Sequence, residues 1–308
     1  MKISRREMLK VSAGAGAGLL LSEWPVFAQE RPLIMRSIPS TGEQIPALGL
    51  GSARTLNVGP PSPEWVPLSN VVRLFHEMGG RFFDTAPSYG TSEIVAGQMV
   101  QELEIENDIF FATKISTGDG RQAGLDQQAG SHRYWGREVI DLNQVHNLRD
   151  VDIHLRTIRE AREEGLTRYV GVTTSFDQQY EQMEQVLRTE ELDFFQVNYS
   201  LGERNAADRL IPLAQDRGIA VVVNEPYNVG RLFAATSGRE LPEWAAEFDC
   251  DSWGQFFLKY ILGHPAVTVI IPATSDPEHL IDNMGGGRGR LPDEPTRRRM
   301  EELFDELA

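Results

Sequence analysis

An alternation of short apolar runs with amphipathic helical stretches constrains the fold most, because it extends over most of the 308 residues. The runs are rich in Val, Ile and Phe, which favour strands, and helical patterns such as 152–165 separate them. Strands that alternate with helices predict a parallel sheet whose outer face is covered by those helices. The eight runs lie at 47–51, 81–85, 109–114, 139–146, 168–173, 193–198, 219–225 and 267–273.

The first run overlaps a predicted hairpin. The segment "IMRSIPSTGEQIPALGLG" has two short runs around the turn residues Ser40, Thr41 and Gly42. Eight strand–helix units in a chain of this length predict the α/β class and a closed (β/α)8 TIM barrel with an N-terminal β-hairpin. An open doubly wound sheet is the alternative, but no G-x-G-x-x-G turn follows a strand-like run.

The composition excludes several classes of partner and site. A net charge of −15 repels phosphate backbones and anionic lipid surfaces, so we expect no nucleic acid partner. Cys250 is the only cysteine, which rules out an internal disulfide and a cysteine-built metal site. No His/Asp/Glu cluster has metal-ligand spacing either, so we predict no metal.

Residues 1–28 have the pattern of a targeting segment. Arg5 and Arg6 precede a Gly/Ala-rich apolar run, and Val26 to Ala28 offers small residues for a signal peptidase. This order resembles a twin-arginine export signal, which implies the twin-arginine machinery as a partner and a periplasmic or exported protein. The run is too short and Gly-rich for a stable membrane anchor. We therefore predict a signal over 1–28 and a single barrel domain over 29–308.

Four titratable residues stand at or just beyond three consecutive strand ends. Asp84 ends the second run and Tyr89 follows it in a turn-rich loop, Lys114 ends the third run, and His146 ends the fourth. Singly, each has an ordinary explanation as a cap, a solvated lysine or a core histidine. In a barrel, however, the carboxyl ends of the strands surround one mouth, where active sites lie. The four side chains are therefore predicted to meet.

These residue types suit proton transfer to a carbonyl oxygen. A tyrosine titrates near ~10, and a neighbouring lysine ammonium favours its phenolate. An aspartate keeps that lysine charged despite burial, and a histidine can orient the carbonyl or share the proton. Because no such group supplies electrons, a hydride-carrying cofactor is implied.

The stretches "FFDTAPSYG", "FFATK" and "VIDLNQVH" resemble the signatures of the aldo-keto reductase family over about residues 49–283. The resemblance implies a barrel that binds NADP or NAD without a Rossmann fold and acts on a small aldehyde, ketone or sugar, or on the matching alcohol. It implies that Tyr89 is the general acid, that Lys114 and Asp84 lower its pKa, and that His146 orients the carbonyl.

The same resemblance assigns the cofactor contacts, with several departures from the family pattern. "GVTTSF" replaces Gly-Val-Ser-Asn-Phe, "NEPY" replaces Tyr-Ser-Pro-Leu, and two cations expected at the 2′-phosphate are replaced by Ala273 and His279. The resemblance alone favours NADP over NAD, whereas the loss of these two cations removes contacts that a 2′-phosphate would use. The implied cofactor-binding residues are Thr173, Thr174, Gln196, Asn224, Pro226, Ala273, Thr274, Ser275, His279, Asp282 and Asn283.

Two other functions remain open at this stage. An exported dinucleotide-binding protein with a sensing or scaffolding role would explain the altered cofactor positions, since the periplasm has no general nicotinamide pool. A Schiff-base aldolase would use Lys114, but an aspartate nearby keeps that lysine protonated and a poor nucleophile.

Overall fold

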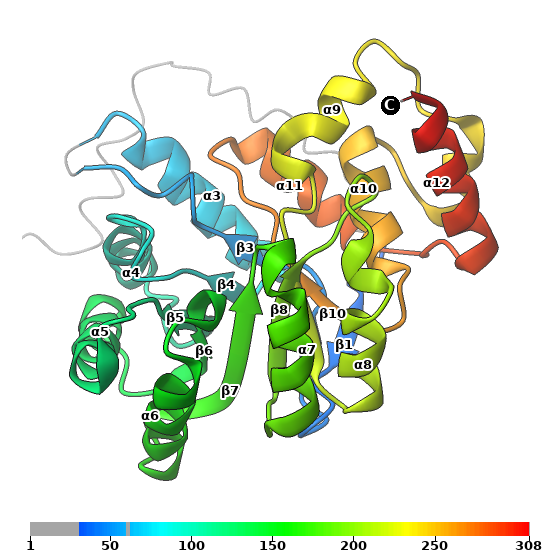
Figure 1. Cartoon of the computed structure of the whole chain (residues 1–308). Helices are drawn as coiled ribbons and strands as arrows, with labels where there is room; N and C mark the ends of the chain where they lie inside the picture. The colour runs from blue at the N-terminus through cyan, green and yellow to red at the C-terminus, as the bar shows by residue number, and fades with distance from the viewer. Residues whose placement is uncertain (1–30, 60–61, 308) are drawn as a thin grey trace, which may run out of the picture.

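The computed structural model describes residues 31–59 and 62–307. The predicted export signal and its cleavage point at Ala28 lie outside these residues. The described part of the chain begins with a two-stranded antiparallel hairpin and continues as strands that alternate with helices (Figure 1). The strands are β1 Met35–Ser37, β2 Gln44–Pro46, β3 Leu50–Gly51, β4 Phe82–Asp84, β5 Phe110–Ile115, β6 Ile140–Val145, β7 Thr167–Thr174, β8 Phe194–Asn198, β9 Ala220–Asn224 and β10 Val267–Ile270.

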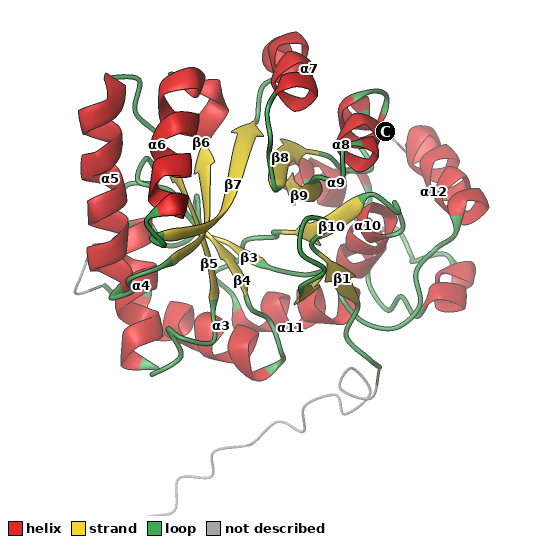
Figure 2. Cartoon of the chain, turned by 90° about the horizontal axis from the view of Figure 1, so that it is seen from below, coloured by secondary structure: helices red, strands yellow, loops and turns green. Residues whose placement is uncertain are grey.

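The helices surround this sheet (Figure 2). They are α3 Trp65–Glu77, α4 Ser92–Glu102, α5 Gly120–Trp135, α6 Val151–Glu163, α7 Tyr180–Thr189, α8 Leu210–Asp216, α9 Arg231–Ala235, α10 Trp253–Leu262, α11 Pro277–Gly286 and α12 Glu294–Leu307. Short 3-10 turns lie at His146–Leu148, Asp177–Gln179, Asn205–Ala207, Asn228–Gly230 and Glu243–Phe248.

The sheet is closed, as the alternation predicts. Its eight parallel strands follow chain order from β3 to β10. Hydrogen bonds then join the two edges: the Gly49 N–H donates to Ile270 O at 2.8 Å, and the Ile270 N–H donates to Ala47 O at 2.9 Å. A Cβ on Gly49 would lie 2.6 Å from the Phe82 carbonyl oxygen, so only glycine fits at this closure. The (β/α)8 barrel is therefore confirmed over the doubly wound sheet.

Apolar side chains fill the barrel interior toward the amino ends of the strands, and polar groups lie at the carboxyl ends. Phe82, Phe110 and Phe194 belong to one interior cluster, which Ile38 and Ile45 of the hairpin complete. Phe83 and Phe111, one residue later on their strands, belong instead to the core beneath the helices. This period of two continues upward, so Asp84 and Lys114 also face the interior, above the phenylalanine layer.

Residues 31–59 and 62–307 contain no helix that is long and apolar enough to cross a membrane.

Candidate active site

A buried ion pair joins the ends of two neighbouring strands. The Lys114 Nζ donates to both oxygens of Asp84 at 2.8 Å and to the Thr85 carbonyl oxygen at 2.8 Å. The lysine side chain is 1% exposed and the aspartate side chain 3%. β4 and β5 pair in register with Asp84 opposite Ala112, which places Lys114 one interior position farther up. All three ammonium protons therefore have acceptors.

Tyr89 returns to this pair through a tight loop. Its N–H donates to Ala86 O at 3.1 Å, and Gly90 takes a φ of +63°, which favours glycine. The Lys114 Nζ lies 5.1 Å from the centre of the Tyr89 ring. The His146 ring stands at 82° to that of Tyr89, with 5.7 Å between centroids. The structure thus brings together all four predicted residues from three strand ends.

The ionisation of this group follows from burial and charge. Burial lowers the pKa of Lys114, but Asp84 and Tyr89 more than offset this effect, so the pKa is raised and the lysine stays charged. Burial raises the pKa of Asp84, and the Lys114 ammonium opposes that rise. With Nζ at 2.8 Å from both carboxylate oxygens, the charged pair is the state that the geometry favours.

The expectation that Lys114 and Asp84 lower the pKa of Tyr89 is wrong in its net direction and for Asp84, and it is right only for Lys114. Burial raises the pKa of Tyr89, Lys114 lowers it, and Asp84 raises it, so the net direction is upward. Desolvation of a phenolate outweighs one nearby ammonium that an aspartate already neutralises. Tyr89 is consequently a protonated phenol at neutral pH, able to give its proton away.

His146 is a neutral imidazole. Burial, followed by the charges of Lys114 and Arg149, lowers its pKa to about 3. Its Nδ1 lies 2.9 Å from Ser116 Oγ and 3.2 Å from Ser88 Oγ. Neither serine was predicted from the sequence. Ser88 precedes Tyr89 in the motif, whereas Ser116 meets His146 because β5 and β6 pair with Ile115 opposite Val145.

Polar side chains continue from this group across the mouth. Gln196 accepts from Gln144 Nε2 at 2.7 Å and donates to Asn224 Oδ1 at 2.5 Å. The Thr173 hydroxyl accepts from the Asn147 N–H at 3.2 Å, and the Thr174 hydroxyl donates to Gln179 at 2.7 Å. Residues predicted to contact the nicotinamide thus lie along one side of the mouth, already bonded to one another or to the next loop.

The residues assigned to the adenine end are held by the fold. The Tyr227 hydroxyl donates to Asn283 Oδ1 at 2.5 Å, and Pro226 beside it, which the resemblance assigns with Asn224 to the nicotinamide end, is buried. Tyr227 also packs against Phe233, with 4.9 Å between ring centroids. Asp282 accepts from Ser252 Oγ at 2.7 Å and Gln255 Nε2 at 2.9 Å.

The segment assigned to the 2′-phosphate is polar and exposed but carries no cation of its own. Ala273, Ser275 and His279 are exposed, and the Thr274 hydroxyl accepts from the Asp276 N–H at 3.0 Å. Asp276 caps α11, where its carboxylate accepts the Glu278 N–H at 2.8 Å. A negative charge therefore stands at the helix N-terminus where the resemblance implies a phosphate.

The nicotinamide side of the mouth fits a carboxamide. Gln144, which donates to Gln196, and Asn198, two residues beyond Gln196 on β8, each have a buried side-chain oxygen with no hydrogen-bond partner among the described residues. Buried polar atoms normally have partners, so this end of the barrel suits a ligand with N–H donors.

A second ion pair, which was not predicted from the sequence, joins two loops at the mouth. Arg54 Nη2 lies 3.5 Å from Glu225 Oε1, joining the loops that follow β3 and β9. The arginine side chain is 67% exposed, so the attraction is weak. Glu225 takes a φ of +47°, which is uncommon for a residue with a side chain.

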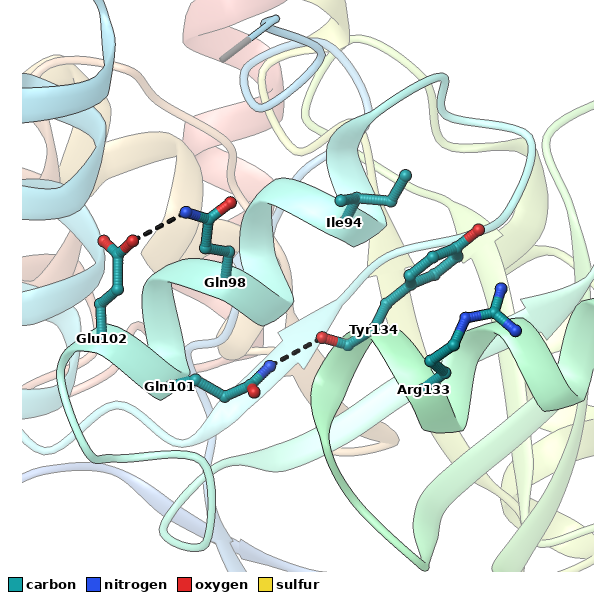
Figure 3. Close-up of a pocket in the computed structure, with 6 residues that line it drawn as sticks. All are labelled: Ile94, Gln98, Gln101, Glu102, Arg133 and Tyr134. Atoms are coloured by element: carbon teal, nitrogen blue, oxygen red, sulfur yellow. Dashed lines mark hydrogen bonds between the residues drawn. The ribbon is translucent and has the colours of Figure 1, made fainter. Parts of the chain in front are cut away.

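The surface pockets beside α4 and α5 are not lined by the four grouped residues. One of about 490 Å³ lies between α4 and α5 (Figure 3). Gln101 donates to the Tyr134 carbonyl oxygen across it at 2.8 Å. None of the four residues grouped at the strand ends lines this hollow, which is a surface groove. Its lining residues are Ile94, Gln98, Gln101, Glu102, Arg133 and Tyr134.

The fold and site together define an α/β-barrel oxidoreductase in which Asp84, Tyr89, Lys114 and His146 are grouped at the carboxyl ends of the strands. The chain belongs to the aldo/keto reductase family, whose model matches residues 47–300. It is similar to aldo-keto reductase str7 of Strobilurus tenacellus, with 24% identity over 287 residues, 80% of this chain and 85% of that protein.

Two further comparisons agree. The chain is 26% identical to the NADH-specific methylglyoxal reductase of Escherichia coli over 184 residues, which are 51% of this chain and 55% of that protein. A crystal structure of an aldo/keto reductase from Klebsiella pneumoniae in complex with NADP and acetate matches with a TM-score of 0.69 and 22% identity, covering 85% of this chain and 93% of that one. This structural likeness supports the fold.

Proposed function

We propose that the protein transfers a hydride between a nicotinamide dinucleotide and the carbonyl or alcohol carbon of a small aldehyde, ketone or sugar. One observation carries the proposal: the buried Lys114–Asp84 pair lies beneath the Tyr89 ring, with the neutral His146 ring at a right angle to it. A bound dinucleotide would supply the hydride, with Thr173 and the unpartnered oxygens of Gln144 and Asn198 beside Gln196 as the groups to hold its carboxamide.

The chain's own residues donate the proton in reduction and accept it in oxidation. Tyr89 is protonated at neutral pH and donates its proton to the carbonyl oxygen during reduction. Lys114 then stabilises the phenolate that remains, and Asp84 keeps the ammonium in place. In the alcohol-oxidising direction, the same phenolate accepts the proton. His146, being neutral, orients the carbonyl by hydrogen bonding.

Tyr89→Phe tests this assignment, because it removes the proton donor and keeps the ring. We expect turnover of simple aldehydes to fall at least about 100-fold, while fluorescence titration still detects dinucleotide binding. Tyr134→Phe, in the groove between α4 and α5, is the matched control with unchanged turnover. Unchanged steady-state rates in Tyr89→Phe would overturn the assignment.

We further propose that NAD(H) is preferred over NADP(H). Ala273 and His279 replace the cations expected at a 2′-phosphate, and the carboxylate of Asp276 stands at the N-terminus of α11. The Escherichia coli relative is named as NADH-specific, whereas the Klebsiella pneumoniae structure holds NADP. Mass analysis of nucleotide released from gently purified protein tests the preference, and recovery of NADP alone would contradict it.

A second candidate is a dinucleotide-binding protein with a sensing or scaffolding role. Both ends of the Gln196 amide are engaged by protein groups, and Glu225 places a carboxylate at the mouth. Binding without turnover over a panel of aldehydes and ketones would favour this role. Rapid oxidation of added NADH or NADPH would refute it.

Export through the twin-arginine route, with a periplasmic or exported location, remains part of the proposal and rests on Arg5 and Arg6. Cell fractionation of a variant with both arginines changed to lysine tests it. We expect the variant to stay in the cytoplasm, and unchanged periplasmic recovery would refute the signal.

A further inference from the structure

The hydrogen bonds of the His146 ring are unequal at its two nitrogens. Nδ1 has two hydroxyl neighbours, Ser116 at 2.9 Å and Ser88 at 3.2 Å. No protein partner of Nε2 is found over residues 31–59 and 62–307. A neutral imidazole carries one proton, and the partners of one nitrogen decide where it resides.

Burial distinguishes the two serines. Ser116 is 3% exposed. Among the described residues, its hydroxyl has one hydrogen-bond partner, which is Nδ1 of His146. Ser88 is exposed, so its hydroxyl can donate to water instead. If Nδ1 carried the proton, the buried hydroxyl of Ser116 would keep an unpaired donor, which is unfavourable. The arrangement therefore favours donation from Ser116 to Nδ1.

The backbone of Ser116 is held on both sides. Its N–H donates to Gln127 Oε1 at 2.7 Å, and its carbonyl oxygen accepts from Arg149 Nη1 at 2.7 Å. Gln127 comes from α5, whereas Arg149 follows the turn that carries His146. Hydrogen bonds from two elements thus hold the backbone of Ser116 beside the His146 ring. The held backbone in turn sets the position of the Ser116 hydroxyl.

We propose that Ser116 is a positioning residue that holds His146 in the tautomer with the proton on Nε2, the nitrogen left for the substrate carbonyl. An Nε2 proton attracts a carbonyl oxygen, whereas an Nε2 lone pair repels it. The inference rests on the proposed carbonyl chemistry for its purpose, but the tautomer itself is a property of the free protein. The low pKa of His146 keeps the ring neutral at the pH of the measurement.

The tautomer can be observed without substrate or cofactor. Full-length protein labelled with 15N-histidine gives long-range 1H–15N spectra in which protonated and unprotonated ring nitrogens differ. The chain has six histidines, and His146→Asn identifies the signals of this one. We expect an unprotonated Nδ1 in the wild type and in Ser88→Ala, a mixture of tautomers in Ser116→Ala, and recovery in Ser116→Thr. A protonated Nδ1 in the wild type, or no change in Ser116→Ala, overturns the proposal.

Kinetics provide the second readout. We expect kcat/KM for an aldehyde to fall about fivefold in Ser116→Ala, the value of one neutral hydrogen bond, and to return in Ser116→Thr. Equal thermal melting of wild type and Ser116→Ala excludes a folding defect as the cause. A tautomer change with no turnover in any form would refute the carbonyl chemistry and leave the role of Ser116 on the ring intact. A tautomer change with full activity would refute the role of Ser116 in the reaction.

Discussion

Asp84→Asn should strongly destabilise the protein, because it leaves a buried ammonium without its counter-ion. The Lys114 Nζ has three acceptors at 2.8 Å, of which the two oxygens of Asp84 carry the charge. An asparagine keeps one acceptor at best. Removing one partner of a buried ion pair costs about 3–5 kcal/mol of unfolding free energy. For a chain of this size, that loss corresponds to a fall in Tm of roughly 10 °C.

The unfolding free energies of the wild type and of Asp84→Asn should depend on pH in opposite directions. In the wild type the raised pKa of Lys114 contributes stability that is present below pH 10.5 and is lost as pH rises through the raised value. Without Asp84, burial dominates and lowers the pKa, so the folded state binds fewer protons than the unfolded state. The stability of Asp84→Asn should then increase from pH 7 toward pH 10 relative to that of the wild type.

Urea unfolding followed by tryptophan fluorescence measures both effects. The double variant Asp84→Asn/Lys114→Met removes the unpaired charge and should recover more than about 1 kcal/mol relative to Asp84→Asn. A loss below about 1 kcal/mol in Asp84→Asn, or equal stability of the single and double variants, would refute the reasoning.

Three other outcomes follow from the structure. Because the pKa of His146 is about 3, kcat/KM should show no histidine step between pH 5 and 8, and an inflection near 6.5 that disappears in His146→Gln would contradict this. Gly49→Ala places a Cβ against the Phe82 carbonyl and should lower the unfolding free energy in urea titrations by about 1–3 kcal/mol. Gly118→Ala is the control, because a Cβ there has no neighbour within 4 Å, and it should change the unfolding free energy by less than about 0.5 kcal/mol. Ala273→Lys adds a cation at the segment assigned to the 2′-phosphate and should tighten NADPH binding on the order of tenfold, with NADH binding unchanged and Ala273→Gln as the neutral control; equal tightening of both in fluorescence titrations would show a nonspecific charge effect.

Much of the fold could be predicted from local sequence pattern. Every predicted strand appears in chain order, and the hairpin forms around the predicted turn. Strand type and order depend on apolar periodicity and turn residues, which are local properties. The interior placement of Asp84 and Lys114 also follows, since the alternation that buries Phe82 and Phe110 continues along the same strands.

The contacts of the cofactor segment could not be predicted in the same way. Asp282 and Asn283 read as ligand-binding polar residues, yet their acceptors are bonded to Ser252 and Tyr227. These partners lie about 30 and 56 residues away along the chain. No local pattern records which distant donor a side chain meets, because the packing of α11 against α10 and against the loop after β9 decides it.

The sequence by itself determined the barrel and the order of its strands. It also determined that Asp84, Tyr89, Lys114 and His146 meet at the mouth of the barrel. Only the tertiary structure decided the protonation of Tyr89 and the partner of His146. Desolvation depends on how completely the mouth is enclosed, so the pKa of Tyr89 rises despite its lysine neighbour. The meeting of Ser116 with His146 depends on the register of β5 against β6, which is fixed when the whole sheet closes.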